Sequence, residues 1–311
     1  MGEVLELPRV IAGVMRWGDW GAKLSTDQLQ ALIEGCLEAG VRCFDHADIY
    51  GHYTEEAYTG FDHADIYGHY TEEAAFGRVL AKAPELRKEM LLVTKCGINL
   101  VTPVRPHYRV KSYDSSKAHI ISSAEQSLRA LNTEQLDVLL LHRPDMLLDA
   151  DEAAEAFQAL SDSGKVRAFG VSNFTPHQFE LLASRWPNLL TNQVELSLKH
   201  ISALTDGTLD QAQRLRLRPM IWSPLGGGNL FGEGAGNLEL SLKLAEVAER
   251  HSTTADVVAY AWVMMHPTKP SVVTGSSKLK RIRRAQAAVD LRLTRQDWYE
   301  LLEAARGEEV A

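Results

Sequence analysis

Ionisable side chains stand directly after short apolar runs at three places in the first half of the chain. Asp45 ends one such run and is followed five residues later by Tyr50. Lys95 ends the run LLVTK, and His142 ends the run VLLLH. Each residue alone is ordinary, because a lysine is often solvated in a loop and a histidine is often satisfied in a core. Together they form a set that can do acid–base chemistry if the fold brings them to one site.

The chemistry of this set is coherent. A tyrosine hydroxyl is a weak acid with an ordinary pKa of about 10. An ammonium group beside it stabilises the phenolate and lowers that pKa, and a carboxylate keeps the ammonium charged and oriented. The imidazole can hydrogen-bond a substrate oxygen or the tyrosine. The set needs neither a metal nor a nucleophile, and it suits protonation of the oxyanion that forms when a hydride reaches a carbonyl.

The segment that carries the aspartate and the tyrosine is present twice in tandem. Residues 44–60 read FDHADIYGHYTEEAYTG and residues 61–77 read FDHADIYGHYTEEAAFG, which are identical at 15 of 17 positions. The first copy directly follows a strand-like run, whereas the second continues into an unbroken helical segment. We therefore expect the extra copy, within residues 46–67, to bulge between the second strand and the second helix, at a modest cost in chain entropy.

Both copies offer an acid, because Tyr67 in the second copy is the counterpart of Tyr50 in the first. The local sequences are identical, so side-chain chemistry does not choose between them. We favour Tyr50, because it keeps Asp45 and its tyrosine in one uninterrupted loop. The duplication also doubles the number of histidines and aspartates, so that the segment resembles a metal-binding cluster. Since these residues came with the copy, we expect no catalytic metal.

Apolar β-type runs alternate with amphipathic helical runs along the chain. Strands are expected at residues 10–13, 41–44, 90–94, 136–141, 166–171, 190–194, 219–222 and 271–273. Helices are expected at residues 26–39, 71–83, 118–131, 151–161, 176–183, 204–215, 238–250, 255–265, 278–288 and 294–306. This alternation predicts one α/β domain over residues 1–311, a (β/α)8 TIM barrel with an additional C-terminal helix. A doubly wound sheet is the alternative, but no GxGxxG motif follows the first strand.

Composition narrows the class of protein. A net charge of −8 argues against a general nucleic-acid binder. The three cysteines are odd in number and lack metal-type spacing, which indicates reduced thiols. The N-terminus does not read as a signal peptide, and no run approaches the ~18 apolar residues of a membrane span. These features predict a cytoplasmic protein.

The motifs at the strand ends resemble the aldo-keto reductase family over essentially the whole chain, most closely its bacterial members of the oxidoreductase type. FDHADIYG is similar to the family's Asp-x-Ala-x-x-Tyr-Gly signature, and VTKCG and LLLHRPD are similar to its lysine and histidine strands. GVSNF, NQVE, WSPLGGG and TGSSKLKRI follow in the family's order. The resemblance implies that Tyr50, or Tyr67 in its place, is the general acid of a carbonyl reduction. Lys95 and Asp45 would support this acid, and His142 would orient the carbonyl.

The resemblance also implies NADP(H) as the cofactor, bound extended and without a Rossmann domain. The residues it assigns to the nicotinamide half of the cofactor are Ser172, Asn173, Gln193, Trp222, Ser223, Pro224, Leu225 and Gly227. The residues it assigns to the adenosine phosphate are Gly275, Ser276, Ser277, Lys278 and Arg281.

A phosphate site at the start of the last barrel helix is also indicated by its residues. Five cations fall within seven positions there, namely Lys278, Lys280, Arg281, Arg283 and Arg284. A solvated helix face would carry the same charges. Two serine hydroxyls and a helix N-terminus beside guanidinium groups nevertheless suit a 2′-phosphate, which favours NADP over NAD. The chain departs from the family at the adenine contacts, where Arg284 and Ala285 replace an acidic residue and an asparagine.

Two other functions fit parts of the sequence. A barrel that binds NADPH with little turnover, as a nucleotide-sensing subunit, would share the cofactor residues. A metal-dependent barrel hydrolase would instead require a bound divalent ion. The partner we expect is a small carbonyl substrate, with Trp17 after the first strand lining its pocket. Neither nucleic acid nor a membrane is expected as a partner.

Overall fold

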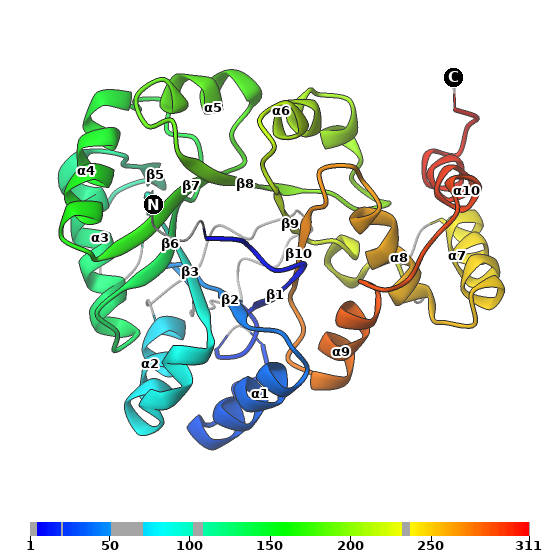
Figure 1. Ribbon diagram of the computed structural model, residues 1–311, viewed down its shortest axis with the longest axis horizontal. Coiled ribbons are helices and arrows are strands. Elements are labelled where there is room, and N and C mark those ends of the chain that lie inside the picture. Colours follow the sequence, from blue (N-terminus) through cyan, green and yellow to red (C-terminus); the bar gives the residue numbers. More distant parts are fainter. Residues whose placement is uncertain (1–4, 20, 51–70, 102–107, 232–236, 311) are drawn as a thin grey trace.

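The described residues contain eight parallel strands that close into a barrel, with helices around its outside (Figure 1). The computed structural model describes residues 5–19, 21–50, 71–101, 108–231 and 237–310. The strands neighbour one another in the order β1-β10-β9-β8-β7-β6-β3-β2, and β1 also pairs with β2 to complete the ring. The predicted (β/α)8 barrel is therefore confirmed.

The barrel strands are β1 (Val10–Gly13), β2 (Cys43–Asp45), β3 (Leu91–Cys96), β6 (Leu136–Leu141), β7 (Val166–Ser172), β8 (Leu189–Glu195), β9 (Met220–Trp222) and β10 (Ser271–Thr274). The helices are α1 (Thr26–Glu38), α2 (Glu72–Lys82), α3 (Lys117–Ala130), α4 (Ala150–Asp162), α5 (Pro176–Ala183), α6 (Thr208–Arg214), α7 (Leu238–Arg250), α8 (Ala255–Met264), α9 (Leu279–Ala287) and α10 (Arg295–Arg306). Most boundaries lie within two residues of the predicted ones.

Burial on both faces explains why the strands read as continuous apolar runs. All six residues of β6, with the sequence LDVLLL, are buried. A small cluster inside the barrel includes Ile11, Val138 and Met220. A much larger cluster fills the space between the outer strand faces and the helices. A strand between two apolar layers has no solvent face, so it shows no alternation of polar and apolar residues.

Side-chain caps determine where several helices begin. Ser25, Thr175 and Thr294 each form a capping box at the start of α1, α5 and α10. Asp149 accepts hydrogen bonds from two backbone amides in the first turn of α4. These caps satisfy backbone amides in the first turn, which have no partner within the helix.

The prediction of one continuous helix over residues 204–215 is wrong. The structure has a short 3-10 turn at Ser202–Leu204 and begins α6 only at Thr208. Gly207 lies between them with a φ of +88°, a left-handed conformation that interrupts a helix and favours glycine. Apolar periodicity alone does not reveal such a break.

A hairpin and a C-terminal helix are present in addition to the alternating strands and helices of the barrel. A two-stranded hairpin, β4 (Ile98–Asn99) and β5 (Ser112–Tyr113), lies in the long loop after β3. The additional helix α10 packs beside α7 at the edge of the molecule, as Figure 1 shows. In the described ranges, no helix has the length and apolar character needed to span a membrane.

Candidate active site

The strand pattern explains why three predicted catalytic side chains reach the barrel interior. Side chains two residues apart in a strand point to the same face. The residues two positions before them belong to the apolar cluster inside the barrel, namely Cys43, Val93 and Leu140. Asp45, Lys95 and His142 therefore form the next layer toward the carboxyl end of the barrel.

Lys95 is at the centre of the polar contacts in this layer and is only 1% exposed. Its ammonium donates to both carboxylate oxygens of Asp45 at 2.8 Å and to the backbone oxygen of His46 at 2.7 Å. It also donates to the hydroxyl oxygen of Tyr50 at 3.2 Å. Because the tyrosine oxygen is the acceptor in this bond, the bond does not use the tyrosine's own proton.

The charge states of these groups follow from their surroundings. Burial lowers the pKa of Lys95, but the charge of Asp45 and hydrogen bonds to Asp45 and Tyr50 offset burial, so the pKa is raised overall. The pKa of His142 lies well below its usual value, because burial disfavours the imidazolium and Lys95, Arg143 and Lys111 repel it. The site therefore combines a charged ammonium with a neutral imidazole near neutral pH.

Tyr50, from the first copy of the repeat, lies beside Lys95. Tyr67 and most of the predicted bulge, residues 51–67, lie outside the described residues. The backbone oxygen of Tyr50 accepts hydrogen bonds from the amides of Thr71 and Glu72 at 3.1 and 3.3 Å. The described residues on either side of the undescribed stretch are thus in direct contact.

The second copy supplies the helix that follows. Helix α2 begins at Glu72, and the next residue, Glu73, is 3% exposed. Burial raises the pKa of Glu73 to about 7, although hydrogen bonds from Thr94 and Ser127 act in the opposite direction. The Thr94 hydroxyl donates to Glu73 at 2.6 Å, which ties α2 to β3.

The catalytic layer opens into a cavity of about 650 Å³ at the carboxyl end of the barrel. Tyr50 and His142 line it together with all eight residues assigned to the nicotinamide, Ser172, Asn173, Gln193, Trp222, Ser223, Pro224, Leu225 and Gly227. Asn173 has a left-handed φ of +59°, which asparagine tolerates better than most residues. The indole nitrogen of Trp222 donates to the side-chain oxygen of Asn173 at 3.0 Å.

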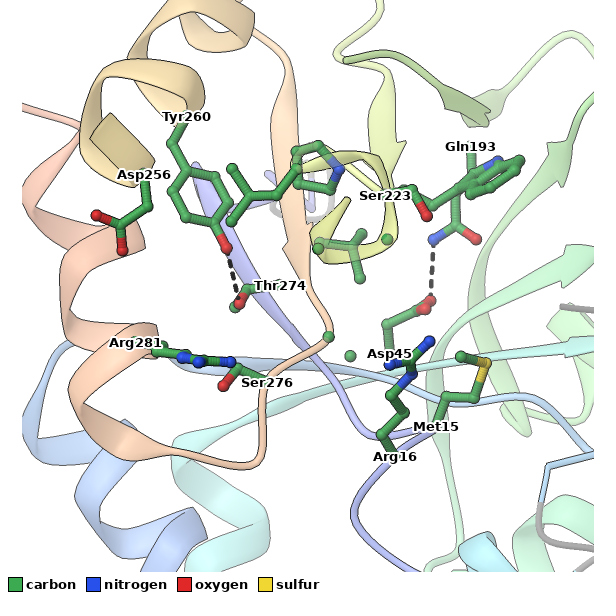
Figure 2. A pocket seen from close by; sticks show the side chains of 18 of the residues that line it. Met15, Arg16, Asp45, Gln193, Ser223, Asp256, Tyr260, Thr274, Ser276 and Arg281 are labelled. Atoms are coloured by element: carbon green, nitrogen blue, oxygen red, sulfur yellow. Dashed lines mark hydrogen bonds between the residues drawn. The ribbon is translucent and has the colours of Figure 1, made fainter. Parts of the chain in front are cut away.

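The other end of the cavity carries three of the five residues predicted to bind the adenosine phosphate. Gly275, Ser276 and Arg281 line it, beside Thr274 and Tyr260, whose hydroxyl groups are 3.1 Å apart. Figure 2 shows this group on one side of the cavity and the Asp45–Gln193 pair on the other. The structure thus places both predicted cofactor ends on one continuous cavity.

Three predicted binding residues do not line this cavity. Ser277 and Lys278 lie beside it, and the Lys278 amide donates to the Ser276 hydroxyl at 3.1 Å. Trp17, predicted in the substrate pocket, is 1% exposed and packs edge to face on Phe44. Its indole donates to the backbone oxygen of Ser276 at 3.0 Å, so it joins the loops after β1 and β10 instead.

Sequence reasoning missed several residues of the cavity wall. Met15 and Arg16 follow β1, and Arg143 follows His142 directly. Their signal was the same one that found the others, a position just after a strand. The Arg143 guanidinium lies 5.7 Å from the centre of the Trp222 ring. Asp256 gave no such signal, since it comes from helix α8 and reaches the cavity through tertiary packing.

Within the described part of the chain, no group of three or more His, Cys, Asp or Glu side chains is arranged to hold a metal ion. His46, which the repeat makes look like a ligand, is fully buried against Phe76 with ring centroids 4.6 Å apart. Burial lowers its pKa to about 3, so its ring is neutral.

Comparison with known proteins agrees with the geometry. The model of the aldo/keto reductase family matches residues 52–306. The chain belongs to this family. Enzymes of this family use nicotinamide cofactors, and this aldo/keto reductase is an oxidoreductase.

The chain is similar to several known proteins over nearly their whole length. Oxidoreductase YdhF of Escherichia coli is 48% identical over 98% of this chain and 96% of its own. A 6-dehydroglucose reductase of Agrobacterium fabrum is 44% identical over 100% of this chain and 98% of its own. Among solved structures, the glycerol dehydrogenase of Gluconobacter oxydans aligns with a TM-score of 0.80 at 23% identity, covering 100% of this chain and 96% of its own, which supports the fold alone.

Proposed function

We propose that this aldo/keto reductase reduces the carbonyl group of an aldehyde or ketone to an alcohol with NADPH, and that Tyr50 is the proton donor. The observation that carries the proposal is the position of the Lys95 ammonium. It contacts both Asp45 and Tyr50, which line the cavity together with a neutral His142.

A nicotinamide bound in the cavity supplies the hydride. The protein's own groups act on the negative charge that then develops on the substrate oxygen. His142, being neutral, donates a hydrogen bond to that oxygen and orients the carbonyl. Tyr50 transfers its hydroxyl proton to the oxygen, and Lys95 stabilises the phenolate that remains. Asp45 keeps the ammonium charged and directed at the tyrosine.

Oxidation of NADPH in the presence of a panel of aldehydes, ketones and quinones tests this proposal. Because one relative is named a 6-dehydroglucose reductase, sugar-derived aldehydes belong in the panel. Turnover that depends on the carbonyl compound is expected. Tight NADPH binding without reduction of any compound would contradict the proposal and favour a nucleotide-sensing barrel. The names of the relatives, which are reductases or oxidoreductases, favour turnover.

The charge of the cavity supports a phosphorylated dinucleotide. Four arginines are part of its lining, namely Arg16, Arg143, Arg281 and Arg284. The carboxylates of the described lining are Asp45 and Asp256, and each has a cationic partner. In a protein with a net charge of −8, such a cavity concentrates positive potential where an anionic ligand would bind.

Arg281→Ala is expected to raise the Kd for NADPH by about 10–100-fold and to change the Kd for NADH much less, because a charge-assisted hydrogen bond contributes about 1.5–3 kcal/mol. Arg281 lines the phosphate end of the cavity near Ser276, as Figure 2 shows. Quenching of protein fluorescence by each dinucleotide measures both constants.

Arg283→Ala is the matched control on the same helix. Arg283 does not line the cavity, and its guanidinium lies 3.9 Å from Glu38 on the outer surface. Its loss should leave both dinucleotide affinities unchanged. Equal losses for the two arginine variants would indicate general electrostatic attraction instead of a specific phosphate contact.

Deletion of residues 51–67 should preserve the fold and stabilise it by about 1.5 kcal/mol, because 20 residues between Tyr50 and Thr71 become three and closing the shorter loop costs less entropy. The product is the same chain that deletion of residues 46–62 would give, so the test does not presuppose which tyrosine acts. Urea unfolding measures the change. A less stable deletion variant would show that the additional copy contributes contacts to the fold.

A further inference from the structure

Asp45 has a second partner from the opposite part of the barrel. The side-chain amide of Gln193, on β8, donates to one carboxylate oxygen of Asp45 at 3.0 Å (Figure 2). The same oxygen accepts a hydrogen bond from Lys95 at 2.8 Å. Gln193 is 3% exposed and Asp45 is 4% exposed, so this contact is screened little by water.

The contact determines which way the Gln193 amide points. An ionised carboxylate only accepts hydrogen bonds, so the group that faces Asp45 must be the NH2 of Gln193. Its carbonyl oxygen is then the acceptor that remains for another donor, and Gln193 lines the cavity. The amide is thereby set to accept a hydrogen bond from a ligand while it donates to the catalytic carboxylate.

The backbone of Gln193 is joined to the rest of the predicted nicotinamide contacts. The backbone carbonyl oxygen of Gln193 accepts a hydrogen bond from the Ser172 hydroxyl at 3.0 Å and another from the backbone amide of Asn173 at 2.8 Å. The Asn173 side chain in turn donates to the Ser172 hydroxyl oxygen at 2.8 Å and accepts from Trp222. A continuous set of hydrogen bonds thus runs from the wall of the cavity to Asp45, Lys95 and Tyr50.

We propose that Gln193 is a positioning residue for proton transfer, which holds Asp45 through its amide and so couples the nicotinamide end of the cavity to the Lys95–Tyr50 acid. This inference rests on the proposed function, since it takes Tyr50 as the proton donor. It gives Gln193 a role in catalysis that a simple contact with the cofactor would not have.

The sign of the effect follows from electrostatics. The Gln193 NH2 stabilises negative charge on Asp45. Without the Gln193 NH2, the Asp45 carboxylate attracts the Lys95 ammonium more strongly. The negative charge of Asp45 is then also less compensated near Tyr50. Both changes disfavour the phenolate, so the tyrosine should lose its proton at a higher pH.

The experiment compares Gln193→Met, which keeps the length of the side chain but has no donor, with the unmodified protein. The alkaline limb of kcat/KM for carbonyl reduction, where the proton donor ionises, should move upward by about half a pH unit or more. Gln193→Glu, which adds a negative charge beside Asp45 in this alkaline range, should move it further. Tyrosinate absorbance, taken as the difference from a Tyr50→Phe variant of each protein, reports the same shift without turnover.

Asn192 provides the control on the same strand. Among the described residues, its side chain bonds to the backbone of Phe174 alone, with distances of 2.7 and 3.3 Å, and it is buried to a similar degree. Asn192→Ala should lower the melting temperature and leave the alkaline limb where it is. An unshifted limb in both Gln193 variants, with only a weaker Kd for NADPH, would overturn the coupling. Failure of the proposed function is distinct, because it would appear as no carbonyl reduction by the unmodified protein, or as full activity of Tyr50→Phe.

Discussion

Replacement of Tyr50 by phenylalanine should lower kcat/KM for carbonyl reduction by about 10²–10⁴-fold, the range that a positioned proton donor contributes. The change removes one hydroxyl oxygen, which accepts a hydrogen bond from Lys95 at 3.2 Å, and keeps the ring that packs edge to face on His142. Affinity for NADPH should be nearly unchanged, because the hydroxyl acts on the substrate. Steady-state kinetics and dinucleotide titration measure the two quantities.

Tyr67→Phe is the matched variant in the second copy of the repeat. Its local sequence is the same as that around Tyr50, so any difference between the two variants reflects position and not side-chain chemistry. Full activity of Tyr67→Phe is expected. Loss of activity in that variant together with retention in Tyr50→Phe would assign the acid to the second copy.

Lys95→Met should abolish activity and also destabilise the fold by about 3 kcal/mol, because it leaves the Asp45 carboxylate buried without its cation. Asp45 is 4% exposed, so water cannot replace the lost ammonium. Gln193 would be its remaining hydrogen-bond donor among the described side chains. Chemical denaturation and NADPH-dependent turnover measure the two effects.

A second substitution separates stability from catalysis. Asp45→Asn, added to Lys95→Met, removes the uncompensated charge and should recover most of the lost stability. Activity should stay absent, since no ammonium remains to stabilise the Tyr50 phenolate. Recovery of turnover in the double variant would mean that Lys95 serves the fold and not the proton transfer.

Strand positions were predictable because most residues on both faces of the barrel strands are buried. An apolar run such as LDVLLL followed by His142 therefore marks a strand and its carboxyl end together. Most helices were predictable from capping residues and apolar spacing. The break at Gly207 and the hairpin of β4 and β5 were not, since each depends on local backbone geometry inside a segment of unremarkable composition.

The positions of the site residues depended on tertiary packing more than the positions of the strands and helices did. The sequence placed Trp17 in the substrate pocket because it follows the first strand, but its ring is buried and its indole donates to the backbone oxygen of Ser276. The ion pair between Arg284 and Asp256, 3.2 Å apart, joins two helices that no spacing rule connects. The same holds for Gln193 and Asp45, which are 148 residues apart in the chain.

The sequence by itself determined the class of fold, the layer of Asp45, Lys95 and His142, and the order of the cofactor segments. It could do so because the two-residue period of a strand and the position of its carboxyl end are local properties of the chain. Only the tertiary structure decided that Tyr50 lies beside Lys95 and that Gln193 holds Asp45. The two copies of the repeat are chemically equal, and these contacts of Tyr50 and Gln193 arise only from the closure of the barrel, which brings β2, β3 and β8 around one interior.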